Sequence, residues 1–225
     1  MILMKFLTLL FFCLISVLQP LKAAELQDKD QAALNRVYVM FNRAFNELDS
    51  APLEDIYAED ATYIPEQQSL AIVQGRENVL KLYQKFFDRI RHKQARIDVD
   101  FRVVQRQAHG KSATDIGYYL VRFHPPKDTE EPMSEFAGKI VIVSHKDKKG
   151  NWLVDVDTSN RAEPEHYFNA KPQPNLYYGE QFAPCPLPAI SHPVLKLKSF
   201  MPSNWQYLSV CPADIRALSF LLQLQ

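Results

Sequence analysis

Residues 134–160 constrain the fold of this 225-residue chain more than any other stretch. Two runs rich in valine and isoleucine, residues 139–145 and 152–158, flank a charged connector that contains Gly150. Such residues suit a pleated, half-buried surface, and a short polar connector with glycine suits a turn. The stretch therefore predicts a β-hairpin.

The second run of this hairpin alternates between apolar and polar residues. Alternation at period two places neighbouring side chains on opposite faces of a strand. One face is predicted to carry Trp152, Val154, Val156 and Thr158, and the other Leu153, Asp155, Asp157 and Ser159. If the face with the two acids points into the protein, the hairpin carries a candidate reactive group; if it points to solvent, it does not.

The rest of residues 28–162 predicts helices followed by further strands. Apolar residues at helical spacing predict amphipathic helices over residues 28–48, 52–58 and 76–91. Alternation or β-branched residues predict strands over residues 61–64, 96–107 and 113–124. Because the helices come early and the strands follow as hairpins, we expect an α+β domain whose antiparallel sheet is covered by helices on one face.

The first 23 residues have the layout of a secretory signal peptide. A short start with Lys5 precedes an apolar run of 13 residues, residues 6–18, and cleavage is expected after Ala23 or Ala24. The run is short for a membrane span, which needs roughly 20 residues. The prediction is a protein exported to the periplasm or secreted, with no membrane contact after cleavage; the alternative is an uncleaved N-terminal anchor.

The C-terminal part, residues 163–225, contains 9 of the 15 prolines and little periodicity. Proline removes a backbone donor and resists helices and central strands, so this part is predicted to be an extension that wraps the domain or stays loose. Cys185 and Cys211 lie in it. In an oxidising compartment they are a candidate disulfide, and the alternative is two unrelated thiols.

Composition and motifs exclude several function classes. The chain has 26 basic and 26 acidic residues, which argues against nucleic acid as a partner. The six histidines lack metal-binding spacing, so no metal site is expected. The sequence contains neither a nucleophile elbow nor a glycine-rich phosphate loop, and no cofactor is expected.

Two segments carry a family resemblance. Residues 55–83 contain E-D-A, a short strand, a loop and G-R-E before a helix rich in aromatic residues. Residues 115–160 read D-x-G-Y-Y-x-V, then G-K-x-V-x-V, then G-N-W-x-V-x-x-D-x-x-N. Over roughly residues 28–162 the chain resembles SnoaL-like domains of unknown function in the nuclear-transport-factor-2-like superfamily. The resemblance implies a cone-shaped fold, in which a curved sheet wraps around the helices and leaves a pocket at the open end.

The resemblance also directs attention to particular residues. Phe41 and Pro65 stand where the ketosteroid isomerases of this superfamily carry their tyrosine and their general base, so isomerase chemistry of that kind lacks its residues. The match that remains is Asp157, whose pKa would rise if it were buried, with Asn160 three residues on. The alternative is that Asp157 is exposed to solvent, or forms an ion pair with Arg122 or Lys139 across the sheet.

Other residues are expected to surround Asp157. Candidate catalytic companions are Tyr63 and His124. The expected pocket residues are Phe41, Phe45, Tyr57, Phe87, Phe101, Tyr119, Arg122 and Asn160. In most folds such aromatic residues pack in the hydrophobic core. In a cone-shaped fold, some of them would line the cavity and favour an apolar ligand.

Three functions follow as hypotheses. The first is binding of a small apolar molecule in the cone. The second is a cyclase, isomerase, hydratase or hydrolase that uses Asp157 as acid or base without a cofactor. The third is an interaction module that forms a homodimer. The fold by itself does not choose among them.

Overall fold

The computed structural model describes residues 26–129 and 131–184 and the backbone of residues 209–210. The predicted signal peptide and both cysteines, Cys185 and Cys211, lie outside these residues. In the described part of the chain, no helix is long and apolar enough to cross a membrane.

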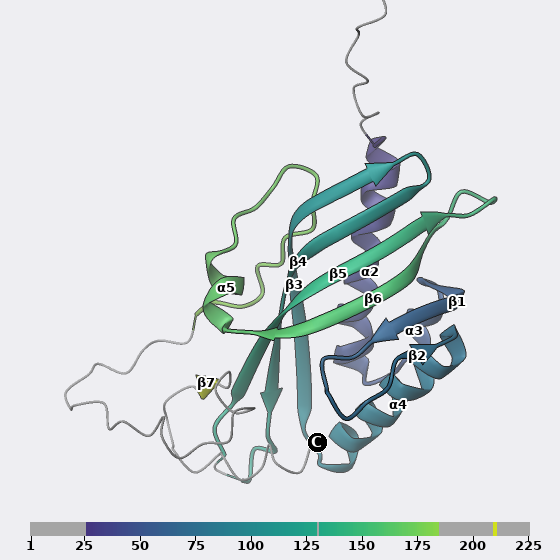
Figure 1. Cartoon of the computed structure of the whole chain (residues 1–225). Coiled ribbons are helices and arrows are strands. Elements are labelled where there is room, and N and C mark those ends of the chain that lie inside the picture. Colours follow the sequence, from purple (N-terminus) through teal and green to yellow (C-terminus); the bar gives the residue numbers. More distant parts are fainter. Residues whose placement is uncertain (1–25, 130, 185–208, 211–225) are drawn as a thin grey trace, which may run out of the picture.

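The described chain begins with helices and continues with long strands (Figure 1). The helices are α2 (Asp28–Glu47), α3 (Ala51–Glu54), α4 (Arg76–His92) and α5 (Pro164–Asn169). The strands are β1 (Tyr57–Ile64), β2 (Val73–Gln74), β3 (Arg96–His109), β4 (Ser112–His124), β5 (Ser134–Lys146), β6 (Trp152–Ala162) and β7 (Ser209–Val210). The predicted hairpin is β5 and β6, and both strands are longer than the sequence indicated.

The strands form one sheet in the order β2-β1-β6-β5-β4-β3, with β7 paired to the start of β5. Neighbours are antiparallel from β6 to β3 along this path, as expected. The expectation of a wholly antiparallel sheet was wrong at one place, because β1 runs parallel to β6. The sheet is therefore mixed.

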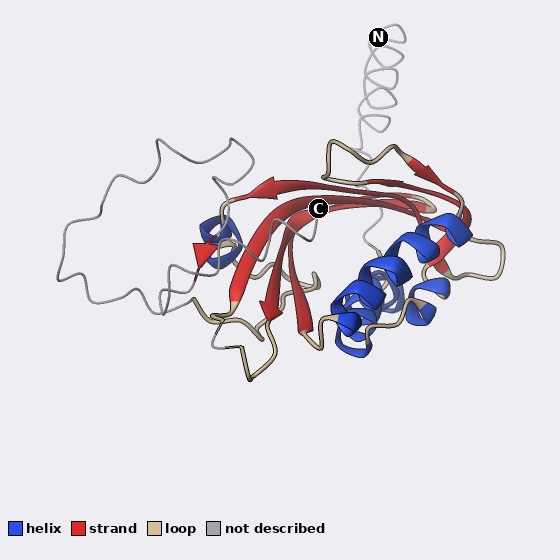
Figure 2. Cartoon of the chain, turned by 90° about the horizontal axis from the view of Figure 1, so that it is seen from below, coloured by secondary structure: helices blue, strands red, loops and turns tan. Residues whose placement is uncertain are grey.

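The sheet curls around the helices without closing. Figure 2 shows the strands as an arc with α2 and α4 on its concave side. The main core lies between them and combines the apolar stripe of α2 with the inward residues of β3, β4 and β5. This is the predicted α+β cone, in which α2 and α4 cover the concave face of a curved sheet.

Helix α2 shows how the sequence produces this packing. Its buried residues Leu34, Val37, Tyr38, Phe41 and Phe45 recur at helical spacing, so one face of the helix meets the sheet. The helix ends at Glu47, and the following residue, Leu48, has a left-handed backbone (φ 53°) and an N–H that bonds back to the last turn. The chain can then turn into α3.

The predicted helix over residues 52–58 is only partly correct. Helix α3 ends at Glu54, and Tyr57 and Ala58 belong to β1. Tyr57 pairs with Val154 of β6, and the N–H of Val154 donates to the carbonyl of Ile56. Pairing with the sheet thus overrides the local helical pattern.

A β-bulge in β6 changes which side chains face the core. Ser144 of β5 pairs with Val154, and Val143 pairs with Val156, so Asp155 is an extra residue. The extra residue shifts the alternation by one, and Asp157 lies on the same concave face as Val154. The prediction that Asp155 and Asp157 share a face was therefore wrong.

The described part of the C-terminal extension packs on the convex face and edge of the sheet. Tyr167 of α5 is buried with Leu120 and Ala137. The backbone at Tyr177 and Gly179 bonds to Val103 and Phe101, and so covers the edge of β3. Covering an edge strand removes a site of unwanted pairing.

Two buried charged residues of β3 hold this extension in place. The Arg102 guanidinium donates to the carbonyls of Tyr167 and Gly179. The Asp100 carboxylate accepts hydrogen bonds from the hydroxyl of Tyr167 and the backbone N–H of Gln181. The extension thus supplies the partners that these charges need in a buried setting.

We expect Gly179→Ala to detach this segment. A β-carbon at Gly179 would collide with the Asp100 carboxylate, which its hydrogen bonds hold in position. The expected cost is about 1–3 kcal/mol of unfolding free energy, with faster proteolysis within residues 170–184. Urea unfolding and limited proteolysis measure the two effects.

Gly110→Ala is the matched control, because no atom lies within 4 Å of a β-carbon there and the strain comes only from the left-handed backbone. It should lower stability modestly without exposing the extension. Equal proteolysis of the two variants would contradict the proposed packing.

Candidate functional site

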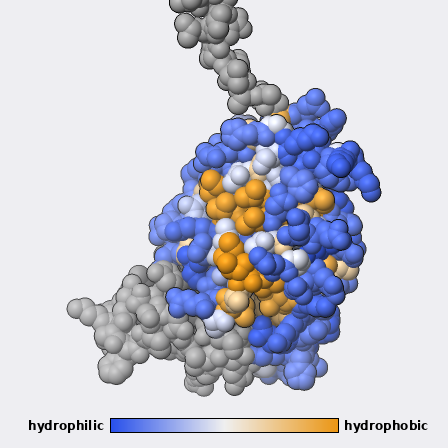
Figure 3. Space-filling model, turned by 45° about the vertical axis from the view of Figure 1, so that its right-hand side comes forward, coloured by the Kyte–Doolittle hydropathy of each residue, from blue (hydrophilic) through white to orange (hydrophobic). Residues whose placement is uncertain are grey.

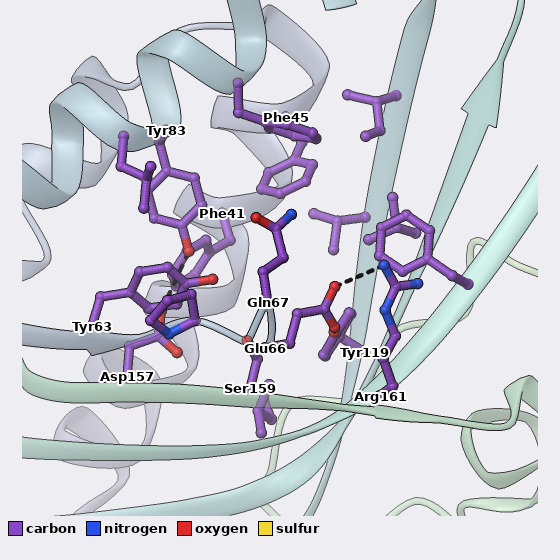
Figure 4. Close-up of a pocket in the computed structure, with 18 of the residues that line it drawn as sticks. Phe41, Phe45, Tyr63, Glu66, Gln67, Tyr83, Tyr119, Asp157, Ser159 and Arg161 are labelled. Atoms are coloured by element: carbon purple, nitrogen blue, oxygen red, sulfur yellow. Dashed lines mark hydrogen bonds and ion pairs between the residues drawn. The ribbon is translucent and has the colours of Figure 1, made fainter. Parts of the chain in front are cut away.

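A cavity of about 220 Å³ lies between the concave face of the sheet, α2 and α4. Its wall is mostly apolar and is formed by Phe41, Phe45, Phe86, Ile90, Ile97, Val99, Phe101, Val121, Phe123, Phe136, Ile140 and Ile142. Most polar groups gather on the side of β6 and of the loop after β1 (Figure 4), and Tyr83 and Arg89 reach the cavity from α4. A ligand in this cavity would therefore meet hydrocarbon on most sides.

Asp157 forms the first polar group of the cavity. It is 5% exposed. Its Oδ2 accepts a hydrogen bond from the Tyr57 hydroxyl at 2.6 Å and a longer one from the Tyr83 hydroxyl at 3.4 Å. Burial raises the pKa of Asp157 to about 6, although the two tyrosines act in the opposite direction by stabilising the carboxylate.

Three elements bring these groups together. The bulge at Asp155 turns Asp157 inward from β6, and Tyr57 opens the neighbouring strand β1. Tyr83 comes from the apolar stripe of α4, and its ring lies 5.7 Å from the ring of Tyr63. Burial, then the charge of Asp157, raises the pKa of Tyr83 and of Tyr63, so both hydroxyls remain proton donors.

Glu66, Arg161 and Tyr119 form a second polar group. Arg161 Nη2 lies 2.9 Å from Glu66 Oε1, and the Tyr119 hydroxyl donates to Glu66 Oε2 at 2.6 Å. The Arg161 guanidinium also lies 4.3 Å from the centre of the Phe136 ring. Figure 4 shows Asp157 and Arg161 on opposite sides of the cavity, with Glu66 and Gln67 between them.

The loop between β1 and β2, residues 65–72, forms part of the cavity rim. Pro65, Glu66, Gln67 and Leu70 line the cavity from this loop. Leu70 and Ile72 are also among the large apolar side chains exposed to solvent. On the side of the molecule where β1 and β2 lie, Figure 3 shows apolar residues gathered among hydrophilic ones. The rim is thus partly apolar.

The structure places six of the predicted site residues on the cavity wall. They are Phe41, Phe45, Tyr63, Phe101, Tyr119 and Asp157. Tyr57 and Phe87 are fully buried behind this wall, where Tyr57 bonds to Asp157 and Phe87 packs on Phe45. These two residues therefore support the wall and do not form its surface.

Three predicted site residues lie elsewhere. Arg122 and His124 alternate with the inward residues Val121 and Phe123 on β4, so they face the convex side, where they pair with Glu135 and Asp98. Asn160 is exposed on β6, between inward Ser159 and Arg161. Arg122 and Asn160 were expected to line the pocket and His124 to accompany Asp157; both expectations were wrong, because the alternation of each strand points these side chains outward.

Sequence reasoning missed six polar residues of the cavity, which are Glu66, Gln67, Tyr83, Arg89, Ser159 and Arg161. Tyr83 was assigned only to an apolar helix stripe, although a tyrosine there carries a hydroxyl into the core. Ser159 and Arg161 follow Asp157 at intervals of two residues and so share its face of β6. The sequence predicted a strand that ended at residue 158, and it gave no sign of the bulge that turns this face toward the core. Glu66 lies in a loop without periodicity, and no local signal identified it.

Among the residues that the structure describes, no group of three metal-ligating side chains is close enough to hold a metal ion. The polar side chains of the cavity supply carboxyl, hydroxyl, amide and guanidinium groups.

We expect Asp157→Asn to remove a pH dependence of stability. Because the pKa of Asp157 is raised to about 6 in the folded state, the folded protein binds the proton more tightly than the unfolded chain does. Stability then falls as the pH rises from about 4 through about 6, by about 3 kcal/mol in all.

Urea unfolding of both proteins between pH 4 and pH 7 measures this effect. The stability of the Asp157→Asn variant should rise relative to that of the natural protein by about that amount across the window. A constant difference between the two proteins would mean that the pKa of Asp157 is not raised.

The comparisons with known proteins support the fold. No family model matches the chain, and no curated protein matches it. Among solved structures, the chain is similar to LinA, with 13% identity over 68% of this chain and 97% of that one and a TM-score of 0.50. At this identity the likeness shows the fold alone.

Two further structures align with the chain. A ketosteroid isomerase-like protein from Erwinia carotovora atroseptica aligns over 61% of this chain and 100% of that one, at 14% identity and a TM-score of 0.48. An NTF2-like protein with a cystatin-like fold from Novosphingobium aromaticivorans aligns over 59% and 82%, at 13% identity and a TM-score of 0.45. The described domain has a cone-shaped α+β fold, as the sequence resemblance implied.

Proposed function

We propose that the domain binds a small, largely apolar molecule in the cone. The observation that carries this proposal is a cavity of about 220 Å³ with an aromatic and aliphatic wall and one deeply buried carboxyl group, Asp157. Mostly apolar sites with a few polar groups that fix orientation are typical of small-molecule binding.

The cavity volume bounds the size of the ligand. An engineered apolar cavity of about 150 Å³ takes up benzene. In proportion, 220 Å³ encloses roughly nine non-hydrogen atoms, such as one ring with a three-carbon side chain, and a slightly longer molecule would extend to the rim. The partly apolar rim at Leu70 would let such a molecule enter without crossing a fully charged surface.

The polar groups suggest how such a ligand is oriented. Both hydrogen bonds to Asp157 end on Oδ2, so Oδ1 is available to a hydroxyl or amide of the ligand. A donor group of the ligand would replace water at this buried acceptor, which favours ligands with one such group over plain hydrocarbons. We therefore expect 3-phenylpropanol to be a suitable probe.

Filling the cavity should abolish binding. Val121→Trp adds a large side chain to the wall, and calorimetry should then detect no binding of 3-phenylpropanol, whereas the natural protein binds it. Val143→Trp is the control, because Val143 is only partly buried and does not line the cavity. Equal binding by the two variants would place the ligand outside the cone and contradict the proposal.

A second candidate function is proton transfer by Asp157. The observation that favours it is the pKa of about 6, because a base whose pKa lies near the working pH is efficient. Tyr57 and Tyr83 hold the carboxylate through Oδ2 and stabilise its charge. The group could remove a proton from a carbon next to a carbonyl and return it, with no cofactor.

Hydrogen exchange tests this second function without knowledge of the substrate. In heavy water, NMR should show exchange of the protons next to the carbonyl of 4-phenyl-2-butanone, at a rate that rises with pH through about 6. Asp157→Asn should reduce the enzyme-dependent rate at least 100-fold. Asp155→Asn, the same change two residues earlier and outside the cavity, should leave the rate intact. Exchange that survives Asp157→Asn would exclude Asp157 as the base.

A further inference from the structure

We infer that the ligand carries a carboxylate, which Arg161 and Tyr119 bind in place of the Glu66 side chain. This inference rests on the proposed binding function and names the chemical class of the ligand. The starting observation is the second polar group of the cavity, formed by Glu66, Arg161 and Tyr119. Binding of an apolar molecule next to Asp157 assigns this group no role.

Arg161 and Asp157 occupy different depths of the same cavity. The Arg161 side chain is 35% exposed, whereas Asp157 is 5% exposed. The two residues lie four positions apart on β6 and face the same way, which corresponds to about 13 Å along a strand. A molecule in the cavity can therefore place an apolar body near Asp157 and a charged end at Arg161.

Arg161 is held ready for an anion. Its guanidinium lies over the Phe136 ring at 4.3 Å from the ring centre, which restricts its orientation. The planar guanidinium matches a carboxylate, and a charge-assisted hydrogen bond to it is stronger than a neutral one. The apolar wall around Arg161 leaves this charge less solvated than it would be on an open surface.

Glu66 shows that the position accepts a carboxylate. One of its oxygens lies 2.9 Å from Arg161 Nη2, and the other accepts the hydrogen bond of the Tyr119 hydroxyl at 2.6 Å. Arg161 and Tyr119 come from the sheet, whereas Glu66 comes from the loop between β1 and β2. The donors are therefore on a rigid element, and the acceptor is on the more adaptable one.

Replacement of Glu66 by a ligand is energetically accessible. The Arg161 side chain is 35% exposed and the Glu66 side chain 12% exposed, so water replaces only part of this ion pair, but a ligand carboxylate would regain the contacts with Arg161 and Tyr119 that Glu66 gives up. If the loop moves and Glu66 turns to solvent, a ligand carboxylate finds the same two donors. The negative charge that develops on Asp157 near neutral pH disfavours the opposite orientation, with the acid at the closed end.

The test compares an acid with its matched alcohol. Calorimetry at pH 7.5 with the full chain measures the affinities of 3-phenylpropanoate and 3-phenylpropanol. Arg161→Gln should weaken binding of the acid about tenfold or more and change that of the alcohol less than twofold. Glu66→Gln removes the internal competitor and should strengthen binding of the acid about tenfold, again without effect on the alcohol.

Arg36→Gln is the matched control, because it removes an arginine from an exposed ion pair with Asp55. It should change neither affinity. Circular dichroism checks that each variant is folded, and Glu66→Gln tests the inference independently if Arg161→Gln does not fold.

The outcomes separate the inference from the function on which it rests. If the natural protein binds the alcohol as tightly as the acid, and neither variant changes the ratio, the carboxylate site is wrong and apolar binding stands. If the natural protein binds neither compound, the proposed binding function fails, and the inference fails with it.

Discussion

The hydrogen bond from Tyr57 to Asp157 is the interaction on which the candidate site depends. It joins a buried carboxyl group on β6 to the first residue of β1, the strand that runs parallel to β6. Tyr83 adds a contact from α4, so that the sheet and a helix meet at one carboxylate. Burial of a carboxyl group costs free energy unless the group is hydrogen-bonded or protonated. Asp157 accepts hydrogen bonds from two tyrosines, and its raised pKa also allows it to be protonated. This balance leaves the pKa of Asp157 at about 6.

The cavity has two ends with different chemistry, and both belong to the same strand. Asp157 at the closed end accepts a hydrogen bond or a proton, whereas Arg161 near the rim attracts a negative charge. The cavity wall is mostly aromatic and aliphatic, and the polar residues Ser159, Glu66 and Gln67 lie between the two ends. If the proposed binding function is correct, such an arrangement would select a molecule by its shape, its apolar body and the order of its polar groups.

Much of the fold could be predicted from the sequence, because amphipathic periodicity and β-branched runs reflect burial directly. The α2 stripe from Leu34 to Phe45 and the β5–β6 hairpin are examples. The parallel pairing of β1 with β6 could not be predicted, since it depends on contacts distant in sequence. The bulge at Asp155 likewise has no local signal, and it reversed the predicted facing of Val156 and Thr158.

The site was predictable only in part for the same reason. Asp157 was found through the family pattern, but its tyrosine partners depend on how α4 and β1 pack against β6. Arg122 and His124 were misplaced because the sequence shows that a strand alternates without showing which face is concave. Export, homodimer formation and the disulfide between Cys185 and Cys211 stay predictions.

The position of a bound probe tests the account most directly. Intermolecular nuclear Overhauser effects can be measured between the ring protons of 3-phenylpropanol and the protein. We expect contacts with Phe41, Phe101 and Ile140, which line the cavity from α2, β3 and β5. Contacts confined to exposed residues such as Ile72 would mean that the probe binds outside the cone, and would contradict the account.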